Sequence, residues 1–228
     1  MTDLTVKKIA KMIDHSLLQP QMTRDDIKEG CEIAKEYGAA TVCVKGYDTE
    51  YSVEQLKGTD VGIATVIGFP HGDSTIESKV FETKDAVSKG ATEIDMVIAI
   101  GLARSGDWDY IKDEIKQIYD ACNGVPLKVI FENAYLTKDE IKKLCQICSE
   151  IGVAFVKTST GYAPSGATLE DVKLMREETP DNIEVKAAGG VRTLDQLIEM
   201  YEVGVTRFGT RSTADILAQA KERGLAEE

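Results

Sequence analysis

Short apolar runs alternate along the chain with longer segments in which apolar residues recur every three or four positions. Most of these runs are apolar almost throughout, which is typical of parallel strands that are covered on both faces. They predict strands near residues 13–17, 40–44, 62–68, 93–99, 127–132, 153–157, 183–187 and 205–208.

The segments between these runs carry the start and stop signals of helices. The clearest is TKDEIKKLCQICSEIG (137–152), in which Thr137 and Glu140 form a capping box and Gly152 ends the helix. Apolar residues recur at helical spacing between these ends. The same capping pattern predicts helices that start at Thr23 with Asp26, Ser74 with Glu77, Thr168 with Asp171 and Thr193 with Gln196; others are expected near 107–121, 213–223 and 50–57.

This alternation of strands and helices predicts a parallel sheet. Eight such units in 228 residues fit an α/β fold, a (β/α)8 TIM barrel, that forms a single domain over residues 1–228. An open doubly wound sheet is the alternative, but no G-x-G-x-x-G motif follows an early strand to support it.

The composition narrows the class of partners. The net charge of −12 argues against nucleic acids and anionic membranes as partners, because both require a basic face on the protein. No signal-peptide core is present, and no uncharged apolar run approaches the roughly 18 residues that a membrane span needs. Five cysteines, an odd number, favour reduced thiols and a cytoplasmic location. Because the acidic chain would repel an anionic substrate at long range, any phosphate site must be built locally, from backbone amides and one or two cations.

Two lysines stand out because they lie inside predicted strands, where lysine is depleted. Lys157 ends the sixth strand and Lys186 lies in the seventh. Residues at the carboxyl ends of barrel strands face the active site, and two adjacent, desolvated ammonium groups disfavour each other's charge. One of the lysines is thus expected to become a nucleophile toward a carbonyl, with Asp95 of the fourth strand relaying protons. A salt bridge at the barrel rim is the alternative interpretation.

Glycine turns follow the last two predicted strands. Gly189 and Gly190 come after the seventh, and a GTRS segment from Gly209 to Ser212 leads from the eighth into the final helix. Loops 7 and 8 with a helix N-terminus are the usual phosphate site of this barrel. We therefore predict a phosphate site here, to which Gly161 could add an amide. An ordinary tight turn is the alternative for the Gly-Gly pair alone.

Several segments together resemble the bacterial 2-deoxyribose-5-phosphate aldolases. They are MIDHSLL, TVIGFPHG, EIDMVIAIG, FVKTSTGYAPSGATLEDVKLM and EVKAAGGVRT, in the family's order, within a likeness that extends from about residue 12 to 213. The KTSTG segment in its strand context is highly specific. The resemblance implies a class I aldolase that needs no metal or other cofactor. It would reversibly cleave 2-deoxy-D-ribose 5-phosphate into acetaldehyde and D-glyceraldehyde 3-phosphate.

The resemblance also implies roles for single residues. Lys157 would form the Schiff base, Lys186 would lower the pKa of Lys157, and Asp95 would relay protons. The positions that match the family's substrate-hydroxyl contacts are Asp14, Ser16 and Thr160, and those that match its phosphate contacts are Gly161, Gly189, Gly190, Gly209 and Ser212. A homodimer is expected on the same grounds.

The chain departs from the family's usual residues at Lys45, Ala99, Asn133, Ala134, Ala188 and Arg211. Arg211 replaces one of two consecutive serines; it would contact the phosphate directly, point to solvent, or narrow the site for another anion. These departures leave open a Schiff-base aldolase that acts on a different sugar phosphate. A barrel that binds a phosphosugar without turning it over is a third hypothesis.

Other motif-like residues are interpreted structurally. Cys145 and Cys148 form one C-x-x-C pair inside an amphipathic helix, for which core packing is the simpler explanation. His71 is expected either to line the pocket mouth or to donate a hydrogen bond within its loop. Cys43 is expected either near the substrate or as a buried, inert thiol. The run DWDYIKDEIKQIYD (107–120) predicts a helix with a solvated charged face.

Overall fold

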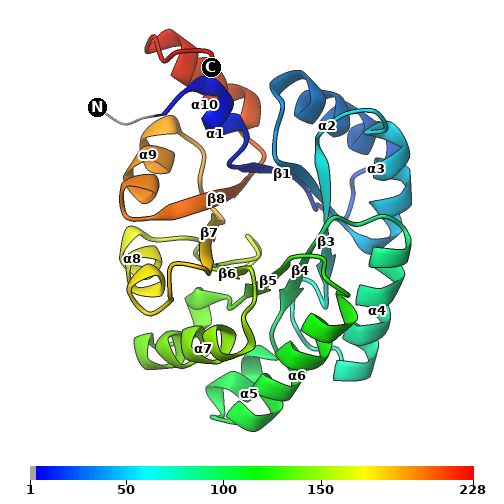
Figure 1. Ribbon diagram of the computed structural model, residues 1–228, viewed down its shortest axis with the longest axis vertical. Coiled ribbons are helices and arrows are strands. Elements are labelled where there is room, and N and C mark those ends of the chain that lie inside the picture. The colour runs from blue at the N-terminus through cyan, green and yellow to red at the C-terminus, as the bar shows by residue number, and fades with distance from the viewer. Residues whose placement is uncertain (1–3) are drawn as a thin grey trace.

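Eight parallel strands form a closed barrel in the computed structural model, which describes residues 4–228. Each strand pairs with the next one along the chain, and β8 closes on β1 (Figure 1). The (β/α)8 barrel is therefore confirmed, and the open doubly wound sheet is wrong. The first three residues of the predicted domain lie outside the described residues. The strands are β1 (Ile13–Leu17), β2 (Thr41–Val44), β3 (Gly62–Ile67), β4 (Glu93–Val97), β5 (Leu127–Ile130), β6 (Phe155–Lys157), β7 (Glu184–Ala188) and β8 (Val205–Thr210).

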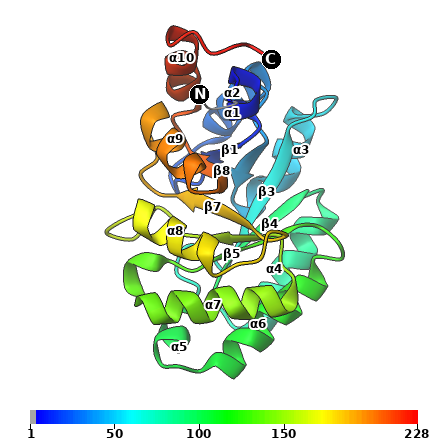
Figure 2. The same cartoon turned by 60° about the vertical axis from the view of Figure 1, so that its left-hand side comes forward.

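Helices surround the barrel on its outside (Figures 1 and 2). They are α1 (Val6–Ala10), α2 (Arg24–Tyr37), α3 (Thr49–Gln55), α4 (Ile76–Ser88), α5 (Ile100–Arg104), α6 (Trp108–Ala121), α7 (Lys138–Ile151), α8 (Leu169–Glu177), α9 (Leu194–Glu202) and α10 (Thr213–Glu222), with 3-10 turns at Gly46–Asp48 and Asn133–Tyr135. Among residues 4–228, no helix is long and apolar enough to cross a membrane. The ends of the described chain meet beside α1 and α10, where the N–H of Val6 donates to the carbonyl of Ala226.

Most predicted helix ends are those of the structure. Thr137 and Glu140 form the capping box of α7, and Gly152 ends that helix with a positive φ of 82°. Thr23 and Thr193 cap α2 and α9 with the same motif. Side-chain capping therefore fixes where these helices begin.

Two details of the helix prediction are wrong. Thr75 rather than Ser74 caps α4, because its side-chain oxygen accepts the N–H of Ser78. Both residues are good N-caps, so composition alone does not separate them. The short helices α1 and α5 were not predicted, since five residues are too few to establish a helical period.

The alternation of side chains along the strands separates an apolar layer from a charged interior. Met96 and Val129 point outward and belong to the largest apolar cluster, which includes Ile115 of α6 and Leu144 of α7. Burying one such side chain contributes roughly 1.5–3 kcal/mol. The residue before each of them in its strand points into the barrel and is charged. The stability of this barrel therefore comes largely from the layer between strands and helices, which leaves its interior available for polar groups.

Candidate active site

Three lysines converge on the carboxylate of Asp95 inside the barrel. Lys157 and Lys186 each donate to Oδ2 of Asp95 at 2.7 Å, and Lys128 donates to Oδ1 at 2.6 Å. Asp95, Lys128 and Lys186 are completely buried, whereas Lys157 is 3% exposed and lines a cavity. The structure thus brings the three predicted catalytic residues together and leaves Lys157 accessible from the barrel mouth.

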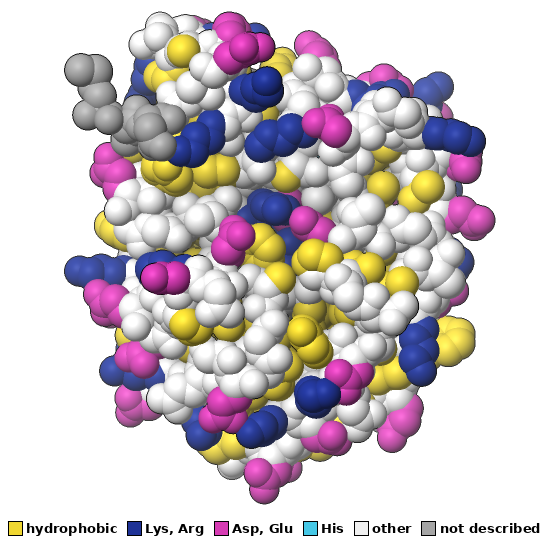
Figure 3. Space-filling model, viewed as in Figure 1, with side chains coloured by type: hydrophobic (Ala, Val, Ile, Leu, Met, Phe, Trp, Pro, Cys, Tyr) yellow, Lys and Arg dark blue, Asp and Glu magenta, His cyan; other side chains and the backbone are white. Residues whose placement is uncertain are grey.

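A second group of charges lies against this cluster. Lys186 also donates to Asp14, whose other oxygen accepts from Arg207 at 2.7 Å. Arg207 and Lys128 both contact Glu93, at 2.9 and 2.5 Å. Figure 3 shows basic and acidic side chains side by side at the centre of the face that is viewed along the barrel. The charges form one connected network across the barrel interior.

The register of the strands explains this convergence. Lys157 is the Cα partner of Lys186, and Lys186 is in turn the partner of Arg207. Asp95 of β4 is the partner of Lys128 in β5. Sequence reasoning missed Lys128, Glu93 and Arg207 as members of this network. The signal was present for Lys128 and Arg207, because each is a cation inside an apolar strand, as Lys157 and Lys186 are.

The pattern of contacts distinguishes Lys157 from the other basic residues. The network contains the carboxylates of Asp14, Glu93 and Asp95 and the basic groups of Lys128, Lys157, Lys186 and Arg207. Lys186 and Arg207 each contact two carboxylates and Lys128 contacts three, whereas Lys157 contacts Asp95 alone. If Lys157 loses its proton, three negative charges face three positive ones. Charge balance in the buried interior therefore favours neutral Lys157.

The pKa values distinguish Lys157 from Lys186 in the same way. Burial lowers the pKa of Lys157; the charge of Asp95 opposes this, and that of Lys186 lowers the pKa further. Burial also disfavours the Lys186 ammonium, but Asp14 and Asp95 outweigh it and hold the pKa of Lys186 above its ordinary value. The surrounding ammonium groups likewise outweigh burial and keep the pKa of Asp95 well below its usual range. Lys157 can thus become a neutral nucleophile while Lys186 stays charged.

A cavity of about 330 Å³ extends from Lys157 to the loops after β7 and β8. This volume is at the lower end of the range for small-molecule sites. All the residues predicted to bind phosphate line it, namely Gly161, Gly189, Gly190, Gly209, Arg211 and Ser212. Ser212 immediately precedes α10, so the positive end of that helix adjoins the cavity. Arg192 lines it too and was missed by the sequence analysis.

Two loops approach so closely at this cavity that they require glycine. A Cβ on Gly166 would lie 2.0 Å from the carbonyl oxygen of Gly189, and Gly189 itself has a positive φ of 80°. The N–H of Ala167 lies 3.0 Å from the carbonyls of both Ala188 and Gly189. The loop after β6 is therefore fixed against the glycine turn after β7, which holds the wall of the cavity in place.

The residues predicted to contact substrate hydroxyls divide into two groups. Ser16 and Thr160 line the cavity. Asp14 is completely buried within the charge network, where Lys186 and Arg207 occupy its oxygens. A contact between Asp14 and substrate stays a prediction.

Two of the departures from the family's usual residues, Ala188 and Arg211, line this cavity. Lys45 instead donates to the carbonyl of Gln19 at 2.8 Å. Asn133 is buried and donates to Sδ of Met175. The other two departures, Ala99 and Ala134, are absent from the lining. The departures that bear directly on the candidate phosphate site are therefore Ala188, the last residue of β7, and Arg211, the first residue after β8.

A second cavity, of about 590 Å³, lies among the loops after β1, β2 and β3. Its walls include Val66, Phe69 and Pro70, and His71 lines this cavity rather than the one that contains Lys157. Leu18 and Tyr162 line both cavities, and Tyr162 packs edge-on against Phe69. The second cavity is larger but does not include Lys157, so we place the chemistry in the first.

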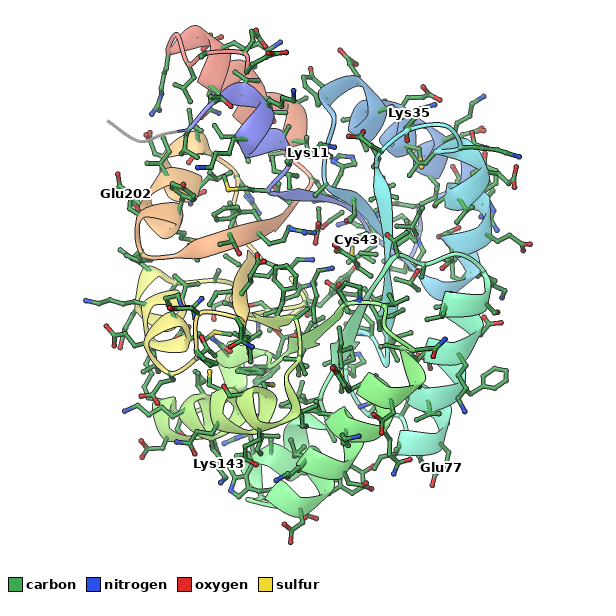
Figure 4. All side chains as sticks on the ribbon, in the orientation of Figure 1. Lys11, Lys35, Cys43, Glu77, Lys143 and Glu202 are labelled. Carbon is green, nitrogen blue, oxygen red and sulfur yellow. The ribbon has the colours of Figure 1, made fainter. Side chains whose placement is uncertain are left out.

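Several other sequence interpretations can be checked directly. Cys43 is buried near the centre of the barrel (Figure 4), and burial raises the pKa of its thiol, as in an inert cysteine. Cys145 and Cys148 are completely buried in the main apolar cluster, so core packing is confirmed.

The expected solvated face of the 107–121 helix is wrong at one residue. Glu114 of α6 is completely buried and accepts hydrogen bonds from Lys79 at 2.5 Å and from the N–H of Ala99 at 2.9 Å. Lys79 also donates to the carbonyls of Gly72 and Val97. A buried charged pair is tolerated when its remaining polar atoms are satisfied in this way.

The fold and the residues at its mouth define a (β/α)8-barrel protein equipped for amine chemistry on a small anionic carbonyl compound. The sequence matches the DeoC/LacD family of aldolases over residues 8–211. The chain therefore belongs to this family.

Individual relatives match along most of their length. The deoxyribose-phosphate aldolase of Caldanaerobacter subterraneus subsp. tengcongensis is 47% identical over 224 residues, which cover 97% of each chain. The protein of that name from Thermoanaerobacter sp. is 50% identical over 214 residues, covering 92% of this chain and 96% of that protein. The tetrameric deoxyribose phosphate aldolase of Aeropyrum pernix superposes with a TM-score of 0.89 at 26% identity, covering 96% of this chain and 93% of that one.

Proposed function

We propose that the chain is a class I aldolase that reversibly cleaves 2-deoxy-D-ribose 5-phosphate into acetaldehyde and D-glyceraldehyde 3-phosphate. One observation carries the proposal. The lysine whose pKa is lowered by burial, Lys157, lines the same cavity as the glycine turns of loops 7 and 8. A nucleophilic amine and an anion site are thus arranged within one small cavity. Membership of the aldolase family supports the choice of reaction.

The first half of the reaction forms the imine. The neutral amine of Lys157 attacks C1 of the open-chain aldehyde and gives a carbinolamine, which loses its hydroxyl as water after a proton is delivered to it. Asp95 lies 2.7 Å from Nζ of Lys157 and from that of Lys186, so it is placed to pass protons between them. The product is a protonated imine on Lys157.

The second half breaks the carbon–carbon bond. The 3-hydroxyl loses its proton and becomes the carbonyl of D-glyceraldehyde 3-phosphate as the C2–C3 bond breaks. The electron pair of that bond moves to the protonated imine and gives an enamine. Protonation of the enamine at C2 and addition of water release acetaldehyde and restore the amine. The imine accelerates this step because it accepts the electron pair far better than a free aldehyde does.

The phosphate would be held at the far end of the cavity. Gly189, Gly190 and Gly209 let backbone N–H groups approach it, and the N-terminus of α10 favours its negative charge. Arg192 and Arg211 supply positive charge locally. Such a local site is needed because the net charge of the chain, −12, repels an anionic substrate at long range.

A different sugar phosphate is the second candidate substrate, and the observation that favours it is Arg211. Its side chain is exposed at the cavity and makes no hydrogen bond or ion pair with residues 4–228. It is therefore free to select the position or number of the substrate's anionic groups. A binding protein without activity is disfavoured, since binding does not require a lysine whose pKa is lowered.

We also propose that the enzyme is cytoplasmic and forms a homodimer. Support for the location comes from the cysteines, which are all buried and unpaired within the part of the chain that the structure describes. The homodimer rests on family likeness, and light scattering of the purified protein tests it against a monomer and a tetramer.

Borohydride trapping tests the reaction. The protein is incubated with acetaldehyde, reduced and digested, and the modified lysine is found by mass spectrometry. A two-carbon adduct on Lys157, absent in Lys157→Met, is expected; an intact protein without it would overturn both aldolase hypotheses. Retro-aldol rates on a panel of 2-deoxy and 2-hydroxy pentose and hexose phosphates then decide between the two substrates.

A further inference from the structure

Glu132 is a buried carboxylate at the barrel mouth that has no part in the reaction steps above. It lies two residues beyond the end of β5 and is 2% exposed. Its backbone is in the left-handed region, with φ and ψ both 61°, which residues other than glycine seldom adopt unless their surroundings hold them there. Within residues 4–228 it forms no ion pair. A carboxylate in such a position requires hydrogen-bond donors.

Thr160 supplies those donors. Its N–H donates to Oε1 of Glu132 at 3.1 Å, and its hydroxyl donates to Oε2. Burial raises the pKa of Glu132, and both bonds from Thr160 oppose this by favouring the ionised carboxylate. The hydroxyl oxygen in turn accepts the N–H of Tyr162 at 3.0 Å. Glu132 therefore uses both of its oxygens to fix one residue, and that residue lines the cavity beside Lys157.

These contacts determine what the Thr160 hydroxyl can offer to a ligand. A threonine hydroxyl has one hydrogen to donate and two lone pairs to accept with. Its hydrogen is held by Glu132, and one lone pair is used by Tyr162. What remains is a single lone pair. Toward the cavity, Thr160 is thus an acceptor and not a donor.

We propose that Glu132 is a positioning residue for the cleavage step: it takes the Thr160 hydrogen, so that Thr160 accepts a hydrogen bond from a substrate hydroxyl. The proposal rests on the proposed function, in which the 3-hydroxyl must lose its proton. An acceptor directed at that hydroxyl orients its hydrogen and stabilises the polarised O–H bond. If Thr160 donated instead, its hydrogen would bind a lone pair of the substrate hydroxyl oxygen, and the hydrogen of that substrate hydroxyl would point away from Thr160.

Glu132→Gln tests the direction of the hydrogen bond between this side chain and the Thr160 hydroxyl, with little change in the shape of the side chain. The amide oxygen of glutamine can still accept the N–H of Thr160, which forces its NH₂ group toward the Thr160 hydroxyl. With that NH₂ and the Tyr162 N–H as donors, both hydroxyl lone pairs are filled, and the hydroxyl hydrogen turns toward the cavity. We expect kcat/KM for cleavage of 2-deoxyribose 5-phosphate to fall about 10- to 100-fold.

Imine formation with acetaldehyde is the second readout, because acetaldehyde has no hydroxyl for Thr160 to contact. Borohydride trapping of acetaldehyde on Lys157 should change by less than about 2-fold in Glu132→Gln, a split that general damage to the site would not produce. The exposed Glu29→Gln on α2 makes the same chemical change away from the barrel mouth and should leave both readouts unaltered. Cleavage at the wild-type rate in Glu132→Gln would overturn the proposal.

A double-mutant cycle tests whether Glu132 acts through Thr160. Thr160→Val removes the acceptor, so adding Glu132→Gln to it should cost no more than about 2-fold further in cleavage. Additive losses would overturn the proposal. If Glu132→Gln does not fold, Thr160→Ser and Thr160→Val decide instead. Serine should retain cleavage within a few-fold while valine loses it, and equal activities would overturn the proposal. Failure of the unmodified protein to trap acetaldehyde would overturn the proposed function instead.

Discussion

Lys157 and Lys186 occupy paired positions in β6 and β7, and their ammonium groups reach the same oxygen of Asp95 at the same distance, 2.7 Å. Their surroundings nevertheless differ. Lys186 has Asp14 as a second carboxylate, whereas Lys157 has the cavity on its other side. This difference, rather than their mutual repulsion alone, decides which lysine loses its proton. The pKa of one is lowered and that of the other raised, within a single hydrogen-bonded group.

Lys186→Met should move the rising limb of the pH–activity profile to higher pH. Removing the Lys186 charge abolishes its repulsion of Lys157 and leaves Asp95 with fewer cations to neutralise it, and both effects raise the pKa of Lys157. Less of the amine is then neutral at a given pH. The measurement is kcat/KM for cleavage as a function of pH. Lys84→Met, at an exposed position on α4, is the control, and an unchanged profile in Lys186→Met would contradict the coupling.

Asp95→Asn should shift imine formation in the opposite direction. Asparagine removes the negative charge that raises the pKa of Lys157, so the amine should be neutral at lower pH and trap acetaldehyde there. Cleavage should still be slower, because the proton relay is lost.

The same substitution leaves Lys128 and Lys186 without one carboxylate partner in the barrel interior. Breaking buried ion pairs in this way costs about 3–5 kcal/mol, which urea unfolding would detect. If the pH profile of acetaldehyde trapping in Asp95→Asn moves to higher pH, as expected for Lys186→Met, Asp95 does not stabilise the protonated form of Lys157.

The strands and most helix ends could be predicted because their signals are local. Thr137 with Glu140 defines a helix start within four residues, and a run such as LKVIFE defines a buried strand. The pair formed by Lys79 and Glu114 could not be predicted in this way. In the sequence, each of these residues fits the solvated face of a helix. The two residues are also 35 positions apart. Their contact depends on how α4 packs against α6, which the period of either helix does not specify.

Part of the candidate site could also be predicted from the sequence. Lys157, Lys186 and Asp95 follow from the rule that charged residues in apolar strands of a barrel face its interior. The number of carboxylates around each lysine does not follow, because it depends on the stagger of strands β1, β4 and β8 around the barrel. The contact of Glu132 with Thr160 was likewise hidden. The left-handed backbone that turns Glu132 toward loop 6 has no signature in the residues FEN.

Arg211→Ser tests whether Arg211 contacts the substrate phosphate. A charge-assisted hydrogen bond contributes roughly 1.5–3 kcal/mol, so KM for 2-deoxyribose 5-phosphate should rise about 10-fold or more. Activity on unphosphorylated 2-deoxyribose should not change, since that compound offers nothing for the guanidinium to bind. Arg104→Ser removes the same charge from an exposed position on α5 and serves as the control. Equal effects on both substrates would place Arg211 outside the phosphate site.

His15 should make the barrel less stable in mild acid. It is 4% exposed in β1, and its Nδ1 lies 2.8 Å from the hydroxyl of Thr213 at the start of α10. Burial lowers the pKa of His15 from 6.5 to about 4. Between these two values the unfolded chain binds a proton that the folded chain does not. The free energy of unfolding therefore falls as the pH falls from 6.5 toward 4 and is constant with respect to His15 below that.

His15→Asn isolates this contribution. The amide can keep a hydrogen bond to Thr213 but does not titrate, so the variant should lose less stability than the wild type between pH 7.5 and pH 4.5. The difference between the two proteins over that range should reach at most about 3 kcal/mol. Urea unfolding at a series of pH values measures it, and subtracting the two curves removes the effects of Glu114 and Glu132, whose raised pKa values act in the opposite sense. Parallel curves for the two proteins would mean that His15 is not neutral in the folded barrel.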